Sequence, residues 1–171
     1  PENPGIGIRS LGADLDAALP LAQAYVDGHA AHRVASCLKH FPGKGAASVD
    51  AHLELPVLEQ TLEEFRHPHL EIFERLIEKD GGAELSIMST HVLVRGLDAE
   101  YPATISRRII TDLLRGELGF RGLMISDDLE MGAVTDQFGS AEAALRAVQA
   151  GHDVVPICHT ASEQIGAAKL I

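Results

Sequence analysis

Four short apolar segments, spread along the chain, place the strongest constraint on its fold. Each segment is nearly continuous in apolar character and does not alternate between apolar and polar residues. That pattern is typical of parallel strands covered on both faces. The segments predicted to form buried strands are Val34–Leu38, Leu85–Met88, Gly122–Ile125 and Asp153–Ile157.

Stretches with an apolar stripe at helical spacing lie between these segments and predict helices. Asp14, Ser106 and Ser140 are the expected N-terminal caps, because their side chains can accept a hydrogen bond from the first turn. Strand, loop and helix thus follow one another repeatedly, which predicts βαβ units with right-handed crossovers and an α/β fold. The predicted helices are Leu15–His29, Glu71–Lys79, Arg107–Arg115, Ala141–Ala150 and Ala161–Leu170.

Charge and hydropathy exclude several kinds of partner. The 171 residues carry a formal net charge of −11, with an isoelectric point near 5.2. A nucleic acid or an anionic membrane needs a basic surface, so neither is an expected partner. No run of about 18 apolar residues predicts a membrane span, and the first residues lack a basic segment followed by an apolar one. A neutral small molecule is the partner that fits best.

Two cysteines, Cys37 and Cys158, each stand inside an apolar run. We expect them to be buried, reduced thiols, because free cysteine behaves as a small apolar residue. Their expected reduced state favours a reducing compartment, and the expected location is cytoplasmic.

Polar residues gather where the predicted strands end. In parallel sheets and barrels, chemistry collects at the carboxyl ends of the strands. The clusters that follow the four predicted strands are Lys39–His40, Thr90–His91, Asp127–Asp128 and Cys158–His159. Their common position predicts one site at this edge of the sheet.

Asp127 directly follows a predicted strand, so its carboxylate should project into a cleft and is a candidate for nucleophilic or acid/base chemistry. A cap or a structural hydrogen bond is the alternative role. Asp128 should point elsewhere, because successive side chains of a strand alternate. Its expected role is to cap a short helix over Leu129–Val134.

Asp50 and His52 stand one residue apart in a loop. In one interpretation the carboxylate fixes the imidazole tautomer and leaves the other nitrogen to exchange a proton with substrate. A solvated loop pair is the alternative. The nine histidines also raise the question of a metal, but no His-X-X-X-His or Cys-X-X-Cys spacing occurs near this pair, so we expect no metal.

Lys39 and His40 are candidates for gripping a neutral polyol through hydrogen bonds, and the alternative is a surface lysine beside a core histidine. For His91 we expect a structural role at the end of its strand. Arg9 lies in the glycine-rich segment Gly5–Gly12, which lacks the spacing of a dinucleotide fingerprint after a strand. No cofactor is expected.

Several spaced motifs, in the same order, resemble the family 3 glycoside hydrolases. The three that carry the resemblance are Lys39–Gly45, Asp50–His52 and Ser126–Met131. The resemblance runs essentially end to end and includes Arg9–Ser10, Pro102–Ser106 and Leu114–Phe120. The bacterial β-N-acetylhexosaminidases of cell-wall recycling are the most similar branch.

The resemblance implies a TIM-type (β/α)8 barrel, with residues 1–171 forming part of the N-terminal catalytic domain and carrying strands four to seven. It implies a retaining hydrolase that removes terminal N-acetyl-β-D-glucosamine from peptidoglycan-derived fragments. Asp127 corresponds to the nucleophile, His52 to the acid/base and Asp50 to its dyad partner. The residues that correspond to sugar-binding positions are Arg9, Lys39 and His40.

Two positions depart from the family pattern: Lys44 stands where a second histidine is usual, and Ala51 replaces a serine. About half of a barrel would also expose sheet edges, so we expect either a longer polypeptide or self-association of two half barrels. Two further readings stay open. One is a glycoside phosphorylase of the same fold, and the other is a sugar-binding or structural fragment without catalysis.

Overall fold

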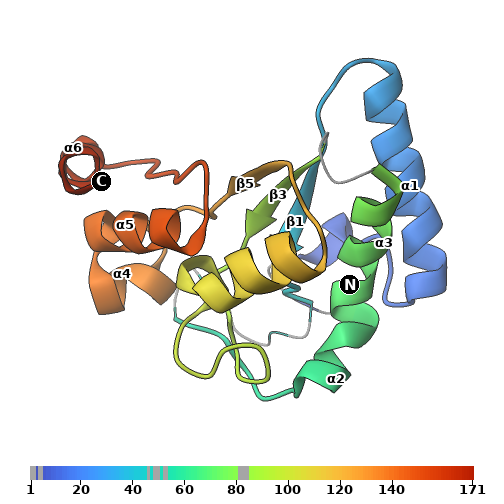
Figure 1. Ribbon diagram of the computed structural model, residues 1–171, viewed down its shortest axis with the longest axis horizontal. Coiled ribbons are helices and arrows are strands. Elements are labelled where there is room, and N and C mark those ends of the chain that lie inside the picture. Colours follow the sequence, from blue (N-terminus) through green and yellow to red (C-terminus); the bar gives the residue numbers. More distant parts are fainter. Residues whose placement is uncertain (1–2, 4–5, 46, 48–50, 52–53, 81–84) are drawn as a thin grey trace.

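The computed structural model describes residues 3, 6–45, 47, 51, 54–80 and 85–171, and they form an α/β structure around a parallel sheet (Figure 1). Strands β1 (Cys37–Phe41), β3 (Ser86–Ser89) and β5 (Leu123–Ile125) pair in the order β1-β3-β5, all parallel. Two shorter strands, β2 (Val57–Leu58) and β4 (Leu93–Val94), form a second parallel pair. The α/β class with a parallel sheet is confirmed, and it is consistent with part of a TIM-type barrel.

Helices lie beside and beyond this sheet (Figure 1). In Figure 1, α1 and α3 lie on the side of β1, and α4, α5 and α6 lie beyond β5. In the part of the chain that the structure describes, no helix is long and apolar enough to cross a membrane. The helices are η1 (Gly7–Arg9), α1 (Leu15–Ala31), α2 (Leu62–Phe65), η2 (Arg66–Leu70), α3 (Glu71–Asp80), η3 (Ala103–Ile105), η4 (Arg108–Glu117), α4 (Gly132–Phe138), α5 (Ser140–Ala150) and α6 (Ala161–Leu170).

Two predicted strands differ from the observed ones. The prediction of Val34–Leu38 is wrong in its bounds, because β1 begins at Cys37 and continues through Lys39 and His40. Backbone pairing to β3 defines the strand, so polar residues can belong to it as well as apolar ones. The prediction of Asp153–Ile157 is also wrong: among the described residues this segment makes only an isolated parallel bridge, between Val154 and Ile125.

The expectation that the strands are covered on both faces is wrong as well. Leu123 of β5 is 47% exposed, although the next residue, Met124, is fully buried. The largest core cluster includes Phe41, Phe73 and Ile87 together with apolar side chains of η4. The sheet thus buries one face against the α3 and η4 side chains.

Cys37 and Cys158 are both exposed, which corrects the prediction of buried thiols. Cys37 is the first residue of β1, which lies at one edge of the sheet order. Cys158 lies in the loop that leads to α6. Apolar neighbours in the sequence did not predict burial, because both segments lie at the periphery of the sheet.

Two of the three expected caps are confirmed. The Asp14 carboxylate accepts from the backbone N of Asp16 at 3.2 Å, and the Ser106 hydroxyl accepts from the backbone N of Ile109 at 3.1 Å. Ser140 is not a cap, since it is the first residue of α5 and the capping position is Gly139, which has no side chain to offer.

Gly122 marks the closest approach between β5 and its neighbour. A Cβ atom at this position would lie 2.0 Å from the carbonyl O of Leu85, just before β3. Only glycine fits such a close backbone approach. The lateral position of β5, and therefore of the residues that follow it, depends on this one missing side chain.

Candidate functional site

The carboxyl ends of the parallel strands bring polar side chains together. His40 lies in β1, and Asp127 follows β5 by two residues. Although β3 separates the two strands in the sheet, His40 Nε2 lies 3.8 Å from Asp127 Oδ2. The strand ends thus place an imidazole opposite a carboxylate, as the sequence predicted for this edge.

His40 is buried and uncharged at neutral pH. Its pKa is lowered to about 4, mainly by burial; the Asp127 carboxylate opposes this shift, and the positive charges of Lys39, Lys44 and Arg9 contribute to it. Its Nδ1 has no hydrogen-bond partner among the described residues. A neutral imidazole with a free ring nitrogen can donate to, or accept from, a ligand hydroxyl.

Asp127 is held by its own backbone environment. Its Oδ1 accepts from the backbone N of Asp128 at 3.0 Å, and the Ser126 hydroxyl donates to the Asp127 carbonyl O at 2.9 Å. With Oδ1 bonded in this way, Oδ2 is the oxygen that faces His40. The side chain is 19% exposed, so a ligand can reach it.

Four of the six predicted site residues surround this point: Asp127 and His40 directly, with Arg9 and Lys39 close enough to influence the pKa of His40. Arg9 and Lys39 are exposed. The other two, Asp50 and His52, lie outside the described residues, so the expected dyad stays a prediction.

Lys44, one of the departures from the family pattern, is buried, with 6% exposure. The side-chain amide of Asn3 donates to the carbonyl O atoms of Lys44 and Ala47, at 2.8 and 2.7 Å. The ammonium of Lys44 also lowers the pKa of both His40 and His91. It therefore adds positive charge beside the site.

Asp128 does not cap a helix, which corrects its predicted role. Helix α4 begins at Gly132, and no side chain caps it. Instead, Asp128 Oδ1 accepts from the backbone N of Glu130 at 3.1 Å and of Cys158 at 3.3 Å. These bonds tie the loop after β5 to the loop before α6.

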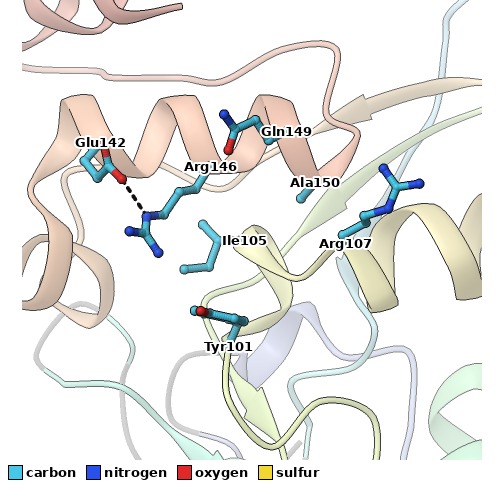
Figure 2. Close-up of a pocket in the computed structure, with 7 residues that line it drawn as sticks. All are labelled: Tyr101, Ile105, Arg107, Glu142, Arg146, Gln149 and Ala150. Carbon is cyan, nitrogen blue, oxygen red and sulfur yellow. Dashed lines mark hydrogen bonds and ion pairs between the residues drawn. The ribbon is translucent and has the colours of Figure 1, made fainter.

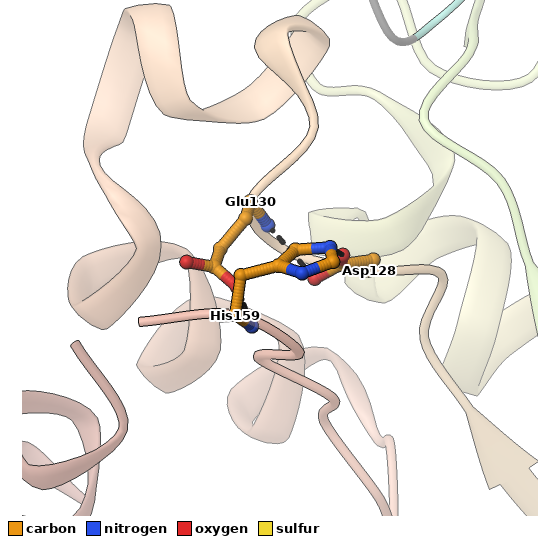
Figure 3. Close-up of side chains that lie close together, drawn as sticks. All are labelled: Asp128, Glu130 and His159. Atoms are coloured by element: carbon orange, nitrogen blue, oxygen red, sulfur yellow. Dashed lines mark hydrogen bonds and ion pairs between the residues drawn. The ribbon is translucent and has the colours of Figure 1, made fainter. Parts of the chain in front are cut away.

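Asp128, Glu130 and His159 lie together beside the site (Figure 3). Their ligand-type atoms lie within 4.8 Å of one another, close enough in principle for a divalent cation. Hydrogen bonds already account for the arrangement, because His159 Nε2 lies 3.3 Å from Asp128 Oδ2 and the His159 backbone N donates to Glu130 Oε2. The Thr160 side chain, which hydrogen-bonds the carboxylate, is the main reason that the pKa of Glu130 is lowered. We describe the group as a hydrogen-bonded cluster.

Three residues at this edge were missed by the sequence prediction: Ser89, Thr104 and His152. All are buried, and they connect to His91 through hydrogen bonds. His91 is fully buried and has both ring nitrogens bonded, in agreement with its expected structural role. The signal available in the sequence was weak, since the three residues stand far apart in the chain and share no motif.

A separate concavity of about 430 Å³ lies away from the strand ends (Figure 2). Side chains of α5 and of the segment around η3 line it, and one of its walls carries the ion pair between Glu142 and Arg146. It contains none of the predicted site residues. The strand-end site, where the predicted residues meet, remains the candidate for chemistry.

Comparison with protein families matches residues 1–171 to the glycosyl hydrolase family 3 N terminal domain. Among curated proteins, a beta-hexosaminidase from Stenotrophomonas maltophilia is 39% identical over 158 residues, which cover 92% of this chain and 46% of that protein. The chain spans about half the length of the curated relatives it matches.

Two solved structures show the same fold over nearly the whole chain. A glycoside hydrolase family 3 beta-N-acetylglucosaminidase from a Paenibacillus species has a TM-score of 0.93 and 35% identity, covering 98% of this chain and 32% of that one. A beta-glucoside phosphorylase, BglX, has a TM-score of 0.88 and 28% identity, covering 98% of this chain and 32% of that one.

Proposed function

Because this chain belongs to glycosyl hydrolase family 3, we propose that it works as a retaining glycoside hydrolase that releases terminal N-acetyl-β-D-glucosamine. The observation that carries the proposal is the placement of Asp127 at a strand end, with one carboxylate oxygen facing the buried, neutral His40. The beta-hexosaminidase and beta-N-acetylglucosaminidase relatives support the choice of sugar.

In the proposed mechanism Asp127 Oδ2 attacks the anomeric carbon and forms a covalent glycosyl ester. His52, paired with Asp50, protonates the leaving oxygen and then activates the water that hydrolyses the ester. These two roles rest on the resemblance of the motif. Imidazole takes the place of the second carboxylate that most glycosidases use.

The groups around His40 suit a neutral, hydroxyl-rich ligand. His40 Nδ1 is buried and has no hydrogen-bond partner among the described residues, which destabilises the protein. A hydrogen bond to a ligand hydroxyl would remove this cost. Arg9 and Lys39 offer donors only, so they fit the lone pairs of sugar hydroxyls. We assign these three residues to substrate binding.

The finer parts of the proposal follow the motif resemblance. The substrate would be a peptidoglycan-derived fragment, the location cytoplasmic, and residues 1–171 would supply strands four to seven of a TIM-type barrel. The open sheet would be completed by further polypeptide or by a second copy of the chain. Light scattering tests the second copy, which a stable 18.3 kDa monomer would exclude.

Phosphorolysis is the second candidate, because the beta-glucoside phosphorylase BglX shares the fold at a TM-score of 0.88. A neutral imidazole repels an attacking phosphate less than a carboxylate would. Product analysis with and without phosphate separates the two: a sugar 1-phosphate identifies a phosphorylase, and free sugar at an unchanged rate identifies a hydrolase.

Trapping with a 2-deoxy-2-fluoro or 5-fluoro glycoside tests the nucleophile. We expect a covalent adduct on Asp127, found by peptide mass spectrometry, and none in Asp127→Asn. Asp128→Asn is the matched control, since Asp128 bonds to backbone amides and should leave the adduct in place. An adduct on another residue would refute the assignment, and neither adduct nor turnover in a folded protein would identify a fragment without catalysis.

A further inference from the structure

A chain of buried hydrogen bonds runs from the loop after β5 to the segment after α5. His91 Nε2 lies 2.9 Å from the carbonyl O of Asp128, and His91 Nδ1 lies 2.9 Å from Thr104 Oγ1. Thr104 Oγ1 lies 3.1 Å from Ser89 Oγ, which in turn lies 2.9 Å from His152 Nε2. His152 Nδ1 ends the chain, 3.0 Å from the carbonyl O of Ala147. Ser89, His91 and Thr104 are fully buried, and His152 is 5% exposed.

Both ends of this chain are carbonyl oxygens, which can only accept. The chain contains five hydrogen bonds and therefore needs five protons. The two hydroxyls supply one proton each, and each neutral imidazole supplies one. With both histidines neutral, four protons are available for five contacts. One of the five contacts therefore has no proton between its two atoms.

Burial favours neutral imidazoles at both ends. It lowers the pKa of His152 to about 4 and lowers that of His91 as well. The charged groups around His91 are Asp127, Asp128 and Lys44. Those around His152 are Arg115 and Asp153.

One arrangement lets both imidazoles donate to the carbonyls. Thr104 then donates to His91 Nδ1, and Ser89 donates to His152 Nε2. No proton then lies between the two hydroxyl oxygens of Ser89 and Thr104, whose separation of 3.1 Å is the longest of the five. This arrangement fixes His91 with its proton on Nε2 and His152 with its proton on Nδ1.

We propose that one half of this chain, Thr104 and His91, forms a positioning relay that orients the Asp128 peptide and, through it, the carboxylate of Asp127, while Ser89 and His152 form a separate pair. The connection is short, because Asp127 Oδ1 accepts from the backbone N of the same Asp128 whose carbonyl O His91 holds. Thr104 and His91 are positioning residues and touch no reacting atom. The effect on catalysis rests on the proposed function, whereas the relay itself does not.

The relay is tested by NMR, because the carbonyl carbon of Asp128 reports its hydrogen bond. Thr104→Val removes the donor to His91 Nδ1 without touching His91 Nε2 or the Asp128 carbonyl. We expect it to move the 13C shift of that carbonyl, and Thr104→Ser to restore it, whereas Ser89→Ala, which changes the other pair, should leave the shift close to wild type. Thr90→Val is the matched control, because the buried Thr90 hydroxyl has no hydrogen-bond partner within the described part of the chain. An unchanged shift in Thr104→Val, or an equal shift in Thr90→Val, overturns the relay.

Kinetics test the positioning role. With an aryl N-acetyl-β-glucosaminide, Thr104→Val should lower kcat about tenfold or more with little change in KM, because small displacements of reacting groups are costly. Thr104→Ser should recover most of the loss, and adding Ser89→Ala to Thr104→Val should cost little more, because Ser89 belongs to the other pair. Wild-type rates in Thr104→Val overturn the positioning role and leave the proposed function intact. If the wild-type protein shows no turnover, the proposed function fails, and the NMR result still decides the relay.

Discussion

Two buried histidines at neighbouring strand ends differ in how their nitrogens are satisfied. His91, after β3, has both ring nitrogens bonded, one to Thr104 and one to the carbonyl O of Asp128. His40, in β1, is nearly as buried, yet its Nδ1 has no partner among the residues that the structure describes. An unsatisfied buried polar group destabilises a fold, so we infer that the two histidines have different roles.

We infer that the hydrogen bonds of His91 stabilise the fold and that the ring nitrogen of His40 is open to bind a ligand. In the first region, both ring nitrogens of His91 form bonds within the protein. The second leaves a nitrogen and a carboxylate oxygen facing the same space, 3.8 Å apart at their nearest atoms. The difference indicates that His40, and not His91, has a ring nitrogen open to a ligand among the residues that the structure describes.

The largest effect should come from the carboxylate that faces His40. Asp127→Asn removes the proposed nucleophile while keeping its size, and we expect kcat to fall by about 10⁴-fold. The midpoint of urea unfolding should stay close to wild type. A large loss of stability with a modest loss of activity would show that the role of Asp127 is structural, like that of His91.

His91→Ala tests whether the hydrogen bonds of His91 stabilise the fold. It leaves the Asp128 carbonyl and the Thr104 hydroxyl without their partner and opens a cavity, so we expect unfolding to become easier by about 3 kcal/mol. Urea denaturation followed by circular dichroism measures the change. A loss below about 1 kcal/mol would show that the two regions do not differ in this way.

His40→Ala is the matching change in the other region. It removes a side chain whose buried Nδ1 has no partner among the described residues, so we expect a loss of stability of only about 1 kcal/mol. Substrate hydroxyls lose a partner, and kcat/KM should fall about 100-fold. If instead His40→Ala destabilises the protein as much as His91→Ala, an unseen partner already satisfies Nδ1.

Acid should weaken the fold through these same histidines. Below its usual pKa of 6.5, His40 takes up a proton in the unfolded chain but not in the folded protein until about pH 4. The unfolded state thus binds more protons across this window, and the free energy of unfolding falls as the pH falls.

Between pH 7 and pH 5, His40 alone should cost about 2 kcal/mol. Urea unfolding at the two pH values measures the slope, and His40→Gln should flatten it. His152, whose pKa is also about 4, should supply a similar slope that remains in His40→Gln. An identical slope in the variant would show that His40 does not titrate in this way.

Much of the framework could be predicted from the sequence. Apolar runs located β3 and β5 within a residue or two, and Asp14 and Ser106 marked helix starts correctly. These features depend on interactions between near neighbours in the chain. The end of β1 was missed because pairing with β3, a distant segment, carries the strand through Lys39 to Phe41.

The site was predictable in part for the same reason. Its strand-end position follows from the parallel sheet, so Asp127 and His40 could be assigned to one edge. The relay could not be predicted, since His91 and Thr104 come from separate segments and carry no spacing signal. The burial of Lys44 depends on loop packing, including the bond from Asn3 to its backbone, that no local pattern records.

The close backbone contact at Gly122 limits which amino acids evolution can place at this position. Every other amino acid would place a Cβ against the carbonyl O of Leu85, at 2.0 Å, and would push β5 sideways. The carboxylate five residues later would move with the strand. Substitution of Gly122 should therefore be tolerated as poorly as substitution of the proposed nucleophile, and a mutational scan scored by activity should find both, one for a structural reason and one for a chemical reason.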